Sequence, residues 1–379
     1  MGGHTTKDIR SIVFVGHGGT GKTMLCESIL FKTGMTTRMG RTTDRNTVSD
    51  FDVEERNRQV SIDLSVLHAD TQGKRFYLLD SPGYADFIGN AVSGLVAADV
   101  AALVITAVNG IEVGARKSWQ LADKMAKPRC IIINKTDAEH TRIPEILEEL
   151  RSAFGNRCIP VNIPDAEGPS FSKVVDVLSP QGNEDYRTEL FEAVVEADEV
   201  LMEQFLETME LAPEDFERVF PAAMAAGSVI PVFFTSADKG IGITEFVEFA
   251  ARFFPDPTYA PALPAKGPKD AEITVPCTPS GPFAARVFRI QTDPFVGKLT
   301  FFKVIRGSVK SNASVQNTAA DAQVKLAHIF TYQGKDSTEI ESAVAGDIVV
   351  VSRIDALTIN SSLCDPAMNN LVEFAPIPF

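Results

Sequence analysis

The fold of this chain is decided by one short stretch, Gly16-His17-Gly18-Gly19-Thr20-Gly21-Lys22-Thr23. An apolar run over 11–15 precedes it, and residues 24–30 have the pattern of a first helical segment, so the sequence predicts strand, turn and helix. In that setting glycines let backbone N–H groups turn toward a phosphate, and the helix N-terminus adds a favourable dipole. The stretch therefore predicts a phosphate loop.

Two side chains of this loop have chemistry of their own. Lys22 supplies a positive charge for the β- and γ-phosphates, and the Thr23 hydroxyl is an expected Mg²⁺ ligand. A glycine-rich turn with a chance Lys-Thr is the alternative, and it is disfavoured because motif, strand and helix coincide. The residues that we expect to bind the phosphates are His17, Gly18, Gly19, Thr20, Gly21, Lys22, Thr23 and Met24.

A second motif, Asp80-Ser81-Pro82-Gly83, follows the apolar run 76–79. At the end of a predicted strand, the Asp80 carboxylate would face the metal, and the Gly83 N–H could approach a γ-phosphate. An Asp-x-x-Gly turn is common, and mostly structural, when it stands alone. Its place after the phosphate loop makes it informative here.

A third motif, Asn134-Lys135-Thr136-Asp137, follows the apolar strand 130–133 and indicates which base is bound. The Asp137 carboxylate can accept hydrogen bonds from guanine N1–H and N2–H, a donor pair that adenine lacks. Asn134 is expected near the base edge and the stem of Lys135 over the base face. In the later segment 235–237, Ser236 and Ala237 could present a backbone N–H to guanine O6. The four motifs together favour GTP over ATP.

Composition bounds the class of protein. The chain has 379 residues, 44% hydrophobic and 23% charged, which is ordinary globular material and long enough for several cores. No apolar stretch approaches the length of a membrane span, so we expect a soluble cytoplasmic protein. Five widely spaced cysteines suggest buried, reduced thiols. The net charge of −14 argues against a surface that coats nucleic acid, and no DNA binding is expected.

Most of the negative charge lies in one window, 184–218, which holds thirteen acidic residues against two basic ones. The distance from Asp137 to Ser236 exceeds one strand–helix unit, so we expect an inserted subdomain over about 156–227. Within it the apolar residues recur at helical spacing and predict one amphipathic helix with an acidic outer face, built on Leu190, Val194, Leu201, Phe205 and Met209. That face is either a solvated surface or a docking site for a basic partner.

A second domain is expected after a proline-rich segment. Residues 255–268 carry five prolines and predict a stiff linker over 255–281. The following runs, 283–290, 299–306 and 347–354, are apolar or alternating between turn residues, which predicts a small all-β barrel over 282–379. The sequence thus predicts an α/β domain over 1–265 with an inserted subdomain, then the barrel. The apolar ending 374–379 suggests a fragment.

These motifs, together with the acidic insertion and the segments 49–62, 285–288 and 293–301, resemble translational GTPases and, within them, elongation factor G. The resemblance spans essentially the whole chain. It implies a P-loop GTPase domain with a mostly parallel sheet, an inserted α/β subdomain and a barrel, followed by further domains that this chain lacks. It also implies GTP or GDP with Mg²⁺, a monomer, and the ribosome as partner. The implied contacts are the activating loop of large-subunit rRNA, stalk proteins through the acidic insertion, and small-subunit rRNA through the barrel.

Three positions depart from the family pattern and resemble the divergent elongation factor G-like paralogues. Tyr84 stands where the family has a histidine that positions the attacking water, and a phenol is a poor proton acceptor near neutral pH. Ser61, with Gln59 before it, stands where a threonine ligates Mg²⁺, and a serine hydroxyl retains that ligand. Gly19 replaces an Asp.

Two hypotheses follow. The first is a GTP hydrolase in which Lys22, Asp80, Gly83 and Tyr84 are the catalytic candidates and Thr23, Ser61 and Asp80 the metal ligands. The second is a guanine-nucleotide-dependent ribosome-binding module in which Tyr84 prevents turnover. Tyr84 could also pack on the phosphate loop without any part in chemistry. A P-loop ATPase would require adenine affinity despite Asp137.

Overall fold

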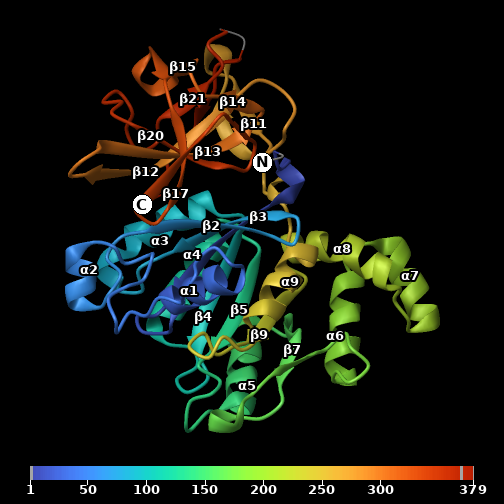
Figure 1. Ribbon diagram of the computed structural model, residues 1–379. Helices are drawn as coiled ribbons and strands as arrows, with labels where there is room; N and C mark the ends of the chain where they lie inside the picture. Colours follow the sequence, from blue (N-terminus) through green and yellow to red (C-terminus); the bar gives the residue numbers. More distant parts are fainter. Residues whose placement is uncertain (1–2, 368–369, 379) are drawn as a thin grey trace.

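The computed structural model describes residues 3–367 and 370–378, and it shows an α/β part followed by an all-β part (Figure 1). A seven-stranded sheet in the order β2-β3-β1-β4-β5-β9-β6 forms the centre of the first part. Only β2 runs antiparallel to its neighbour. The strands are β1 (Ile9–Gly16), β2 (Ser65–Thr71), β3 (Lys74–Asp80), β4 (Val100–Thr106), β5 (Arg129–Asn134), β6 (Cys158–Pro160) and β9 (Ile230–Phe234).

Helices cover both faces of this sheet, because successive strand residues point to opposite sides. Ile12 and Phe14 pack in one cluster with side chains of α1 and α9, whereas Val13 and Val15 pack in another with α3, α4 and α5. The helices of this part are α1 (Lys22–Lys32), α2 (Val53–Arg58), α3 (Ile88–Ala97), α4 (Val113–Lys124), α5 (Ile143–Phe154) and α9 (Ile243–Phe253), with 3₁₀ turns η1 (Thr6–Asp8) and η2 (Ala85–Phe87).

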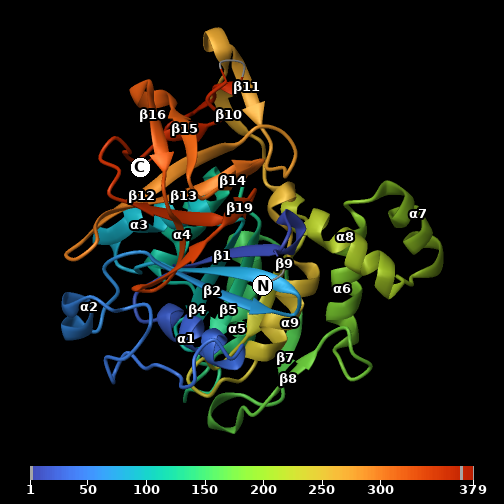
Figure 2. The same cartoon turned by 45° about the horizontal axis from the view of Figure 1, so that its top comes forward.

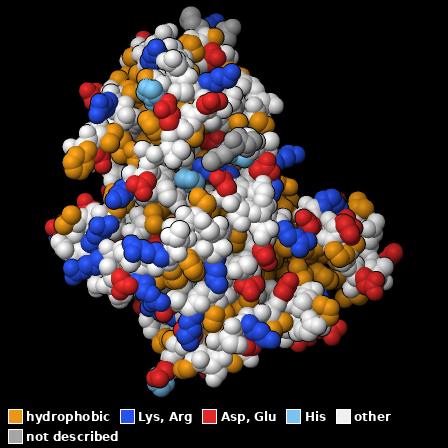
Figure 3. Space-filling model, viewed as in Figure 1, with side chains coloured by type: hydrophobic (Ala, Val, Ile, Leu, Met, Phe, Trp, Pro, Cys, Tyr) orange, Lys and Arg blue, Asp and Glu red, His pale blue; other side chains and the backbone are white. Residues whose placement is uncertain are grey.

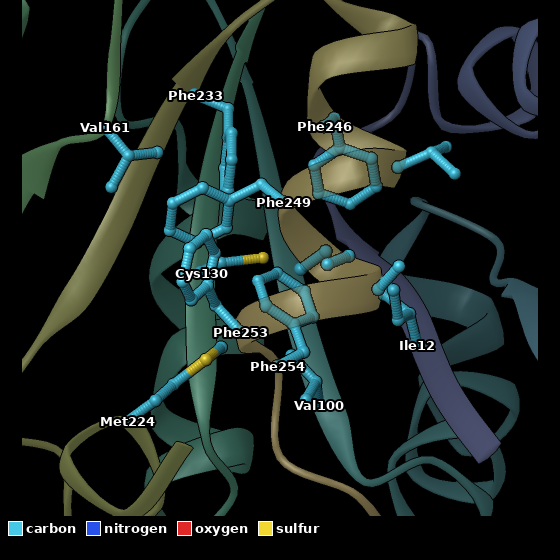
Figure 4. Close-up of a cluster of buried hydrophobic side chains, with 14 of the residues drawn as sticks. Ile12, Val100, Cys130, Val161, Met224, Phe233, Phe246, Phe249, Phe253 and Phe254 are labelled. Atoms are coloured by element: carbon cyan, nitrogen blue, oxygen red, sulfur yellow. The ribbon is translucent and has the colours of Figure 1, made fainter. Parts of the chain in front are cut away.

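Aromatic side chains fill the layer between α9 and the sheet (Figure 4). Phe233 of β9 meets Phe246 of α9 edge to face, with ring centroids 5.0 Å apart. Phe249 lies 5.3 Å from Phe233 in a similar geometry. Aromatic pairs of this kind stabilise a core by more than the burial of their surface area contributes. They therefore hold β9 and α9 firmly together.

The inserted segment contains β7 (Asn162–Pro164), η3 (Gly168–Ser170), β8 (Val174–Asp176), α6 (Glu184–Val195), α7 (Glu199–Thr208) and α8 (Pro213–Ala226). The prediction of a single amphipathic helix is wrong: the acidic window forms α6, α7 and the first part of α8. The chain breaks because Asp198 caps α7 by accepting the Leu201 N–H at 3.1 Å. Leu190, Val194, Leu201 and Phe205 are buried as expected, but Met209 is 56% exposed. β6 belongs to the main sheet, so the part outside that sheet begins after Pro160.

The proline-rich segment is more structured than a linker. It forms η4 (Pro257–Tyr259), β10 (Leu263–Lys266), η5 (Pro268–Asp270) and β11 (Glu272–Val275). β10 lies between β11 and β22 (Glu373–Phe374), which comes from the far end of the chain. The end of the second part therefore folds back on its beginning. The boundaries 1–265, 255–281 and 282–379 stay predictions.

The second part is antiparallel throughout, and the predicted fold class is confirmed. Its main sheet has the order β16-β15-β21-β12-β13-β20-β17-β18. The strands are β12 (Ala284–Asp293), β13 (Gly297–Arg306), β15 (Ala313–Asn317), β16 (Ala322–Leu326), β17 (Ile329–Gln333), β18 (Asp336–Ile340), β20 (Ile348–Ser352) and β21 (Ser362–Cys364). β14 (Ser308–Lys310) pairs with β19 (Ser342–Val344), and η6 (Thr318–Ala320) follows β15. The order of hydrogen-bonded strands begins at β16 and ends at β18, so the sheet is an open half-barrel with these two strands at its edges.

The two parts lie against each other (Figure 2), and polar contacts join them. Lys303 of β13 pairs with Asp99 at 2.5 Å, and both side chains are almost fully buried. The Tyr77 hydroxyl of β3 donates to Asp347 at 2.8 Å. Arg289 of β12 pairs with Asp63 at 3.1 Å, directly before β2. The all-β part thus contacts the segment before β2, which also carries Ser61.

In the described ranges 3–367 and 370–378, no helix combines the length and the apolar character that crossing a bilayer requires. All five cysteines are buried, and burial raises the pKa of the Cys130 thiol above its usual range.

Candidate functional site

A cavity of about 310 Å³ lies at the carboxyl end of β1, where the predicted motifs meet. Its walls come from the phosphate loop, the loop 42–61 and the segment 81–84, with Lys135 closing one side. A larger cleft of about 620 Å³ lies between α5, α6 and α8, away from every motif. The chemistry points to the smaller cavity, because ligands bind at the carboxyl ends of strands in open α/β sheets.

The phosphate loop runs from the end of β1 to the start of α1, as the sequence predicts. Gly21 has φ +94°, a left-handed conformation that favours glycine, and it directly precedes the helix. Lys22 is buried and folds back over the loop, where its Nζ donates to the His17 carbonyl at 2.8 Å. Burial lowers the pKa of Lys22 to about 8, although nearby Asp80 opposes this effect. Backbone carbonyls therefore hold the Lys22 ammonium at the loop. Because burial disfavours its charged form, a bound anion would stabilise it.

The predicted metal ligands converge beside Lys22. The Thr23 and Ser61 hydroxyls are 3.0 Å apart, although they come from α1 and from the loop before β2. Asp80 ends β3 next to them, and both of its carboxylate oxygens are buried without a hydrogen-bond partner among the described residues. Burial raises the pKa of Asp80; the Thr23 hydroxyl, which lies near the carboxylate but outside hydrogen-bond geometry, and the Lys22 charge oppose that rise.

This arrangement fits a hard divalent cation. Oxygen ligands of this kind suit Mg²⁺, which binds one or two carboxylates together with substrate phosphates. A buried carboxylate without partners is costly unless something neutralises it. Asp80, Thr23 and Ser61 would hold the ion, and the unpartnered carboxylate oxygens of Asp80 beside the paired Thr23 and Ser61 hydroxyls are the observation that supports it.

The structure adds Asp50, which the sequence reasoning did not single out. This carboxylate is buried in the cavity wall, and its pKa is raised by burial and by the nearby charge of Asp80. Two further acidic residues fix the loop that carries Asp50 and Ser61. Glu27 of α1 accepts the Val48 N–H at 2.6 Å, and Glu55 of α2 accepts the N–H groups of Ile62 and Asp63 at 2.9 and 3.0 Å. Asp50 and Glu55 lie in the segment 49–62 that carries the family resemblance, and the capping pattern Asp52–Glu55 is a further sequence signal, for the short helix α2.

The base end is a closed hydrogen-bond network centred on Asn134. Its Nδ2 donates to the Thr20 carbonyl at 2.9 Å, and its Oδ1 accepts the Ala237 N–H at 3.0 Å and the Thr235 hydroxyl at 3.2 Å. Instead of standing free at a base edge, Asn134 joins the phosphate loop to the segment that holds the buried Ser236. Lys135 donates to the Gly19 carbonyl at 2.8 Å.

The predicted base reader lies beside this network. The side chain of Asp137 is 18% exposed, and Lys239 Nζ is 3.4 Å from its Oδ2. One carboxylate can thus keep a basic neighbour and still accept hydrogen bonds from a ligand. Asp137 follows Thr136, whose N–H donates to the Thr235 carbonyl at 3.1 Å, so its backbone is fixed relative to Ser236 and Ala237.

The remaining predicted residues lie on the phosphate side. Gly83 packs on the loop, because a side-chain carbon there would lie 2.7 Å from the Gly18 nitrogen. Tyr84 lines the cavity and is 49% exposed. Met24 lines the cavity as well, whereas the imidazole of His17 points to Glu112, with Nε2 3.7 Å from its carboxylate.

Comparisons with known proteins agree with this geometry. The family described as "Elongation factor Tu GTP binding domain" matches residues 7–256, and "Elongation factor G domain 2" matches residues 282–366. An "Elongation factor G-like protein" of Thermotoga maritima is 31% identical over 96% of this chain and 54% of its own length.

A solved structure shows the same likeness. A crystal structure of a protein from Thermus thermophilus superposes with a TM-score of 0.84 at 31% identity, covering 98% of this chain and 56% of the other. The chain thus spans about half the length of these relatives.

Proposed function

This chain belongs to the elongation factor G family of translational GTPases, and from that premise we propose that it binds GTP with Mg²⁺ and hydrolyses it to GDP with stimulation by the ribosome. The observation that carries the proposal is the buried carboxylate of Asp80, which has no hydrogen-bond partner among the described residues. It stands beside Lys22, Thr23 and Ser61 at one end of a site whose other end presents Asp137.

In the proposed reaction water attacks the γ-phosphorus, the bond to the β–γ bridging oxygen breaks, and GDP and phosphate leave. Bound Mg²⁺ would supply charge neutralisation at the β- and γ-phosphates. Lys22 would bind the same phosphates, and the Gly83 N–H would donate to the γ-phosphate. Asp137 would select guanine, with backbone N–H groups near Ser236 and Ala237 at O6. Catalysis of this kind depends chiefly on positioning and electrostatics.

A role for Tyr84 at the reacting end is supported by its place in the wall of the phosphate cavity. A phenol can donate or accept a hydrogen bond to orient water, but it is a poor base near neutral pH. We therefore propose slow intrinsic turnover. The variant Tyr84→His should raise ribosome-stimulated turnover, and an unchanged rate would remove Tyr84 from the catalytic group.

The proposed partner surface for the ribosomal stalk is α7. In the space-filling view, acidic side chains surround the lobe formed by α6–α8 (Figure 3). Glu199, Glu203 and Glu207 are exposed on α7, and so are the apolar side chains of Met202 and Leu206. An apolar stripe with an acidic border suits a basic, partly apolar partner. The double variant Glu203→Lys/Glu207→Lys should lower ribosome-stimulated turnover and leave intrinsic turnover unchanged. The contact of the all-β part with small-subunit rRNA, the monomeric state and the cytoplasmic location stay predictions.

The deciding experiment measures GTP hydrolysis with and without 70S ribosomes, together with the affinities for GDP and ADP. Ribosome-stimulated phosphate release supports the hydrolase. Binding of GTP and ribosomes without turnover would support the alternative, a nucleotide-dependent ribosome-binding module in which Tyr84 blocks the reaction. Equal affinity for ADP and GDP would contradict the role of Asp137.

A further inference from the structure

The phosphate loop and the segment after β3 fit together at one place, Gly18 and Tyr84. A side-chain carbon added to Gly18 would lie 2.9 Å from Cε2 and 3.0 Å from Cζ of the Tyr84 ring. Real side-chain carbons essentially never approach other atoms so closely. A side chain at position 18 would therefore have to displace the Tyr84 ring, which is half exposed in the wall of the cavity and so can move.

The closest obstacle to a side chain at position 18 is the Tyr84 ring. The three atoms nearest to the added carbon all belong to Tyr84. Gly18 is not among the glycines with positive φ, so its backbone accepts an ordinary residue. Gly19 is the opposite case, because its φ is +77° and nothing lies within 4 Å of an added carbon. Glycine is thus favoured for different reasons at the two neighbouring positions, a steric one at position 18 and a conformational one at position 19.

The contact between the Tyr84 ring and Gly18 also bears on the position of the Gly83 backbone. This residue directly precedes Tyr84, and a carbon added to it would lie 2.7 Å from the Gly18 nitrogen and from the His17 carbonyl carbon. The backbone of Gly83 therefore lies close against the phosphate loop and Lys22, directly before the residue whose ring meets Gly18. In the proposed function the Gly83 N–H is the donor to the γ-phosphate.

We propose that Gly18 is a seat for the Tyr84 ring, and that the seated ring holds the Gly83 N–H in place to discriminate guanosine triphosphate from diphosphate. Gly18 is a positioning residue in this account, since it acts through Tyr84 and Gly83. The inference rests on the proposed function, because it assumes that guanine nucleotides occupy this site. Only the triphosphate has the oxygen atoms that the Gly83 N–H would contact, so losing the seat weakens the triphosphate selectively.

The test is a double-mutant cycle on the full chain with Gly18→Ala, Tyr84→Ala and the two combined. Affinities are measured for GDP and for a non-hydrolysable GTP analogue by titration calorimetry. Each single variant should lower affinity for the analogue by about three- to tenfold and change affinity for GDP by less than about twofold. The combined variant should be no weaker than Tyr84→Ala, because the collision at position 18 is then gone.

Two control variants separate the seat from other effects. Tyr84→Phe keeps the ring and should retain the preference for the triphosphate. Gly19→Ala introduces backbone strain without a collision, so its effect should add to that of Tyr84→Ala. Additive effects in the Gly18–Tyr84 cycle, or equal losses for GDP and the analogue, would overturn the proposal.

The outcomes also separate this inference from the proposed function. If the unaltered chain binds no guanine nucleotide, the proposed function fails. If it binds both nucleotides but the cycle is additive, only the seat fails. If Gly18→Ala does not fold, Tyr84→Ala alone tests the proposal. An unchanged ratio of its affinities for the GTP analogue and for GDP overturns the proposal, and a selective loss of affinity for the analogue supports it.

Discussion

The two ends of the candidate site differ in how well the protein satisfies its own polar groups. At the base end, the amide of Asn134 makes three hydrogen bonds, to the phosphate loop and to the segment 235–237. At the phosphate end, both oxygens of Asp80 lack partners among the described residues. Burial also lowers the pKa of Lys22 to about 8 and raises the pKa of Asp50 and of Asp80.

This difference indicates a division of labour. The base end is organised before any ligand arrives, so it contributes specificity without much rearrangement. The phosphate end holds buried charge that only a cation and phosphates can satisfy, so occupancy there should change stability and the order of the loop 42–61. Changes at the two ends should therefore have opposite effects on the empty protein.

The largest expected effect is at the base reader. Asp137→Asn replaces one acceptor oxygen by an N–H₂ donor, which faces the guanine donors instead of accepting from them. Affinity for GTP should fall about 100-fold, since a mismatched polar contact leaves buried groups unpaired. Affinity for XTP, which has a carbonyl in place of the guanine amino group, should rise in the same titrations. A parallel loss for both nucleotides would mean that Asp137 supports structure instead of reading the base.

Removing the base-end network should destabilise the empty protein. Asn134→Ala leaves the Thr20 carbonyl and the Ala237 N–H without their partner in a buried region. The free energy of unfolding should fall by about 2 kcal/mol, measured by urea denaturation without nucleotide. An unchanged free energy of unfolding would show that the base end is no better organised in the empty protein than the phosphate end.

The matched change at the phosphate end should have the opposite sign. Asp80→Asn removes a buried charge, so the empty protein should gain about 1 kcal/mol of unfolding free energy at pH 7. Because the folded pKa of Asp80 is raised, its ionised form destabilises the fold, and that penalty is absent below about pH 4. The gain should therefore disappear as the pH is lowered toward 4.

The same variant also tests the metal. Nucleotide affinity of Asp80→Asn should lose its dependence on Mg²⁺, measured by titration with Mg²⁺ and with EDTA. Destabilisation of the empty protein, or an intact Mg²⁺ dependence, would contradict the assignment of this end.

The two ends also differ in how much of them could be predicted from sequence. Each motif that follows a strand was located from the sequence, because a strand end fixes where the next residues lie, as with Asp80 and Asn134. Asp50 was missed because it lies in an irregular loop, where spacing carries no geometry. The segment that carries it is held on either side by Glu27 and Glu55, which accept N–H groups of Val48 and of Ile62 from separate helices. The break between α6 and α7 was missed for a related reason: apolar spacing continued through a cap at Asp198.

The smallest expected effect is a pH dependence confined to the phosphate end. Burial lowers the pKa of Lys22 to about 8 in the empty protein, whereas bound phosphates would favour its charged form and raise that pKa. Nucleotide binding should therefore take up a proton, and affinity should fall about fourfold between pH 7 and 8.5 as the free ammonium deprotonates. Calorimetry in buffers with different ionisation enthalpies measures the proton uptake directly. Lys22→Arg is the matched control, because a guanidinium stays charged throughout this range and its residual affinity should be flat. Proton release on binding would contradict this assignment, and so would an equal pH dependence of affinity in Lys22→Arg and in the unaltered protein. Either result would assign the pH dependence to another group and remove the contrast between the two ends of the site.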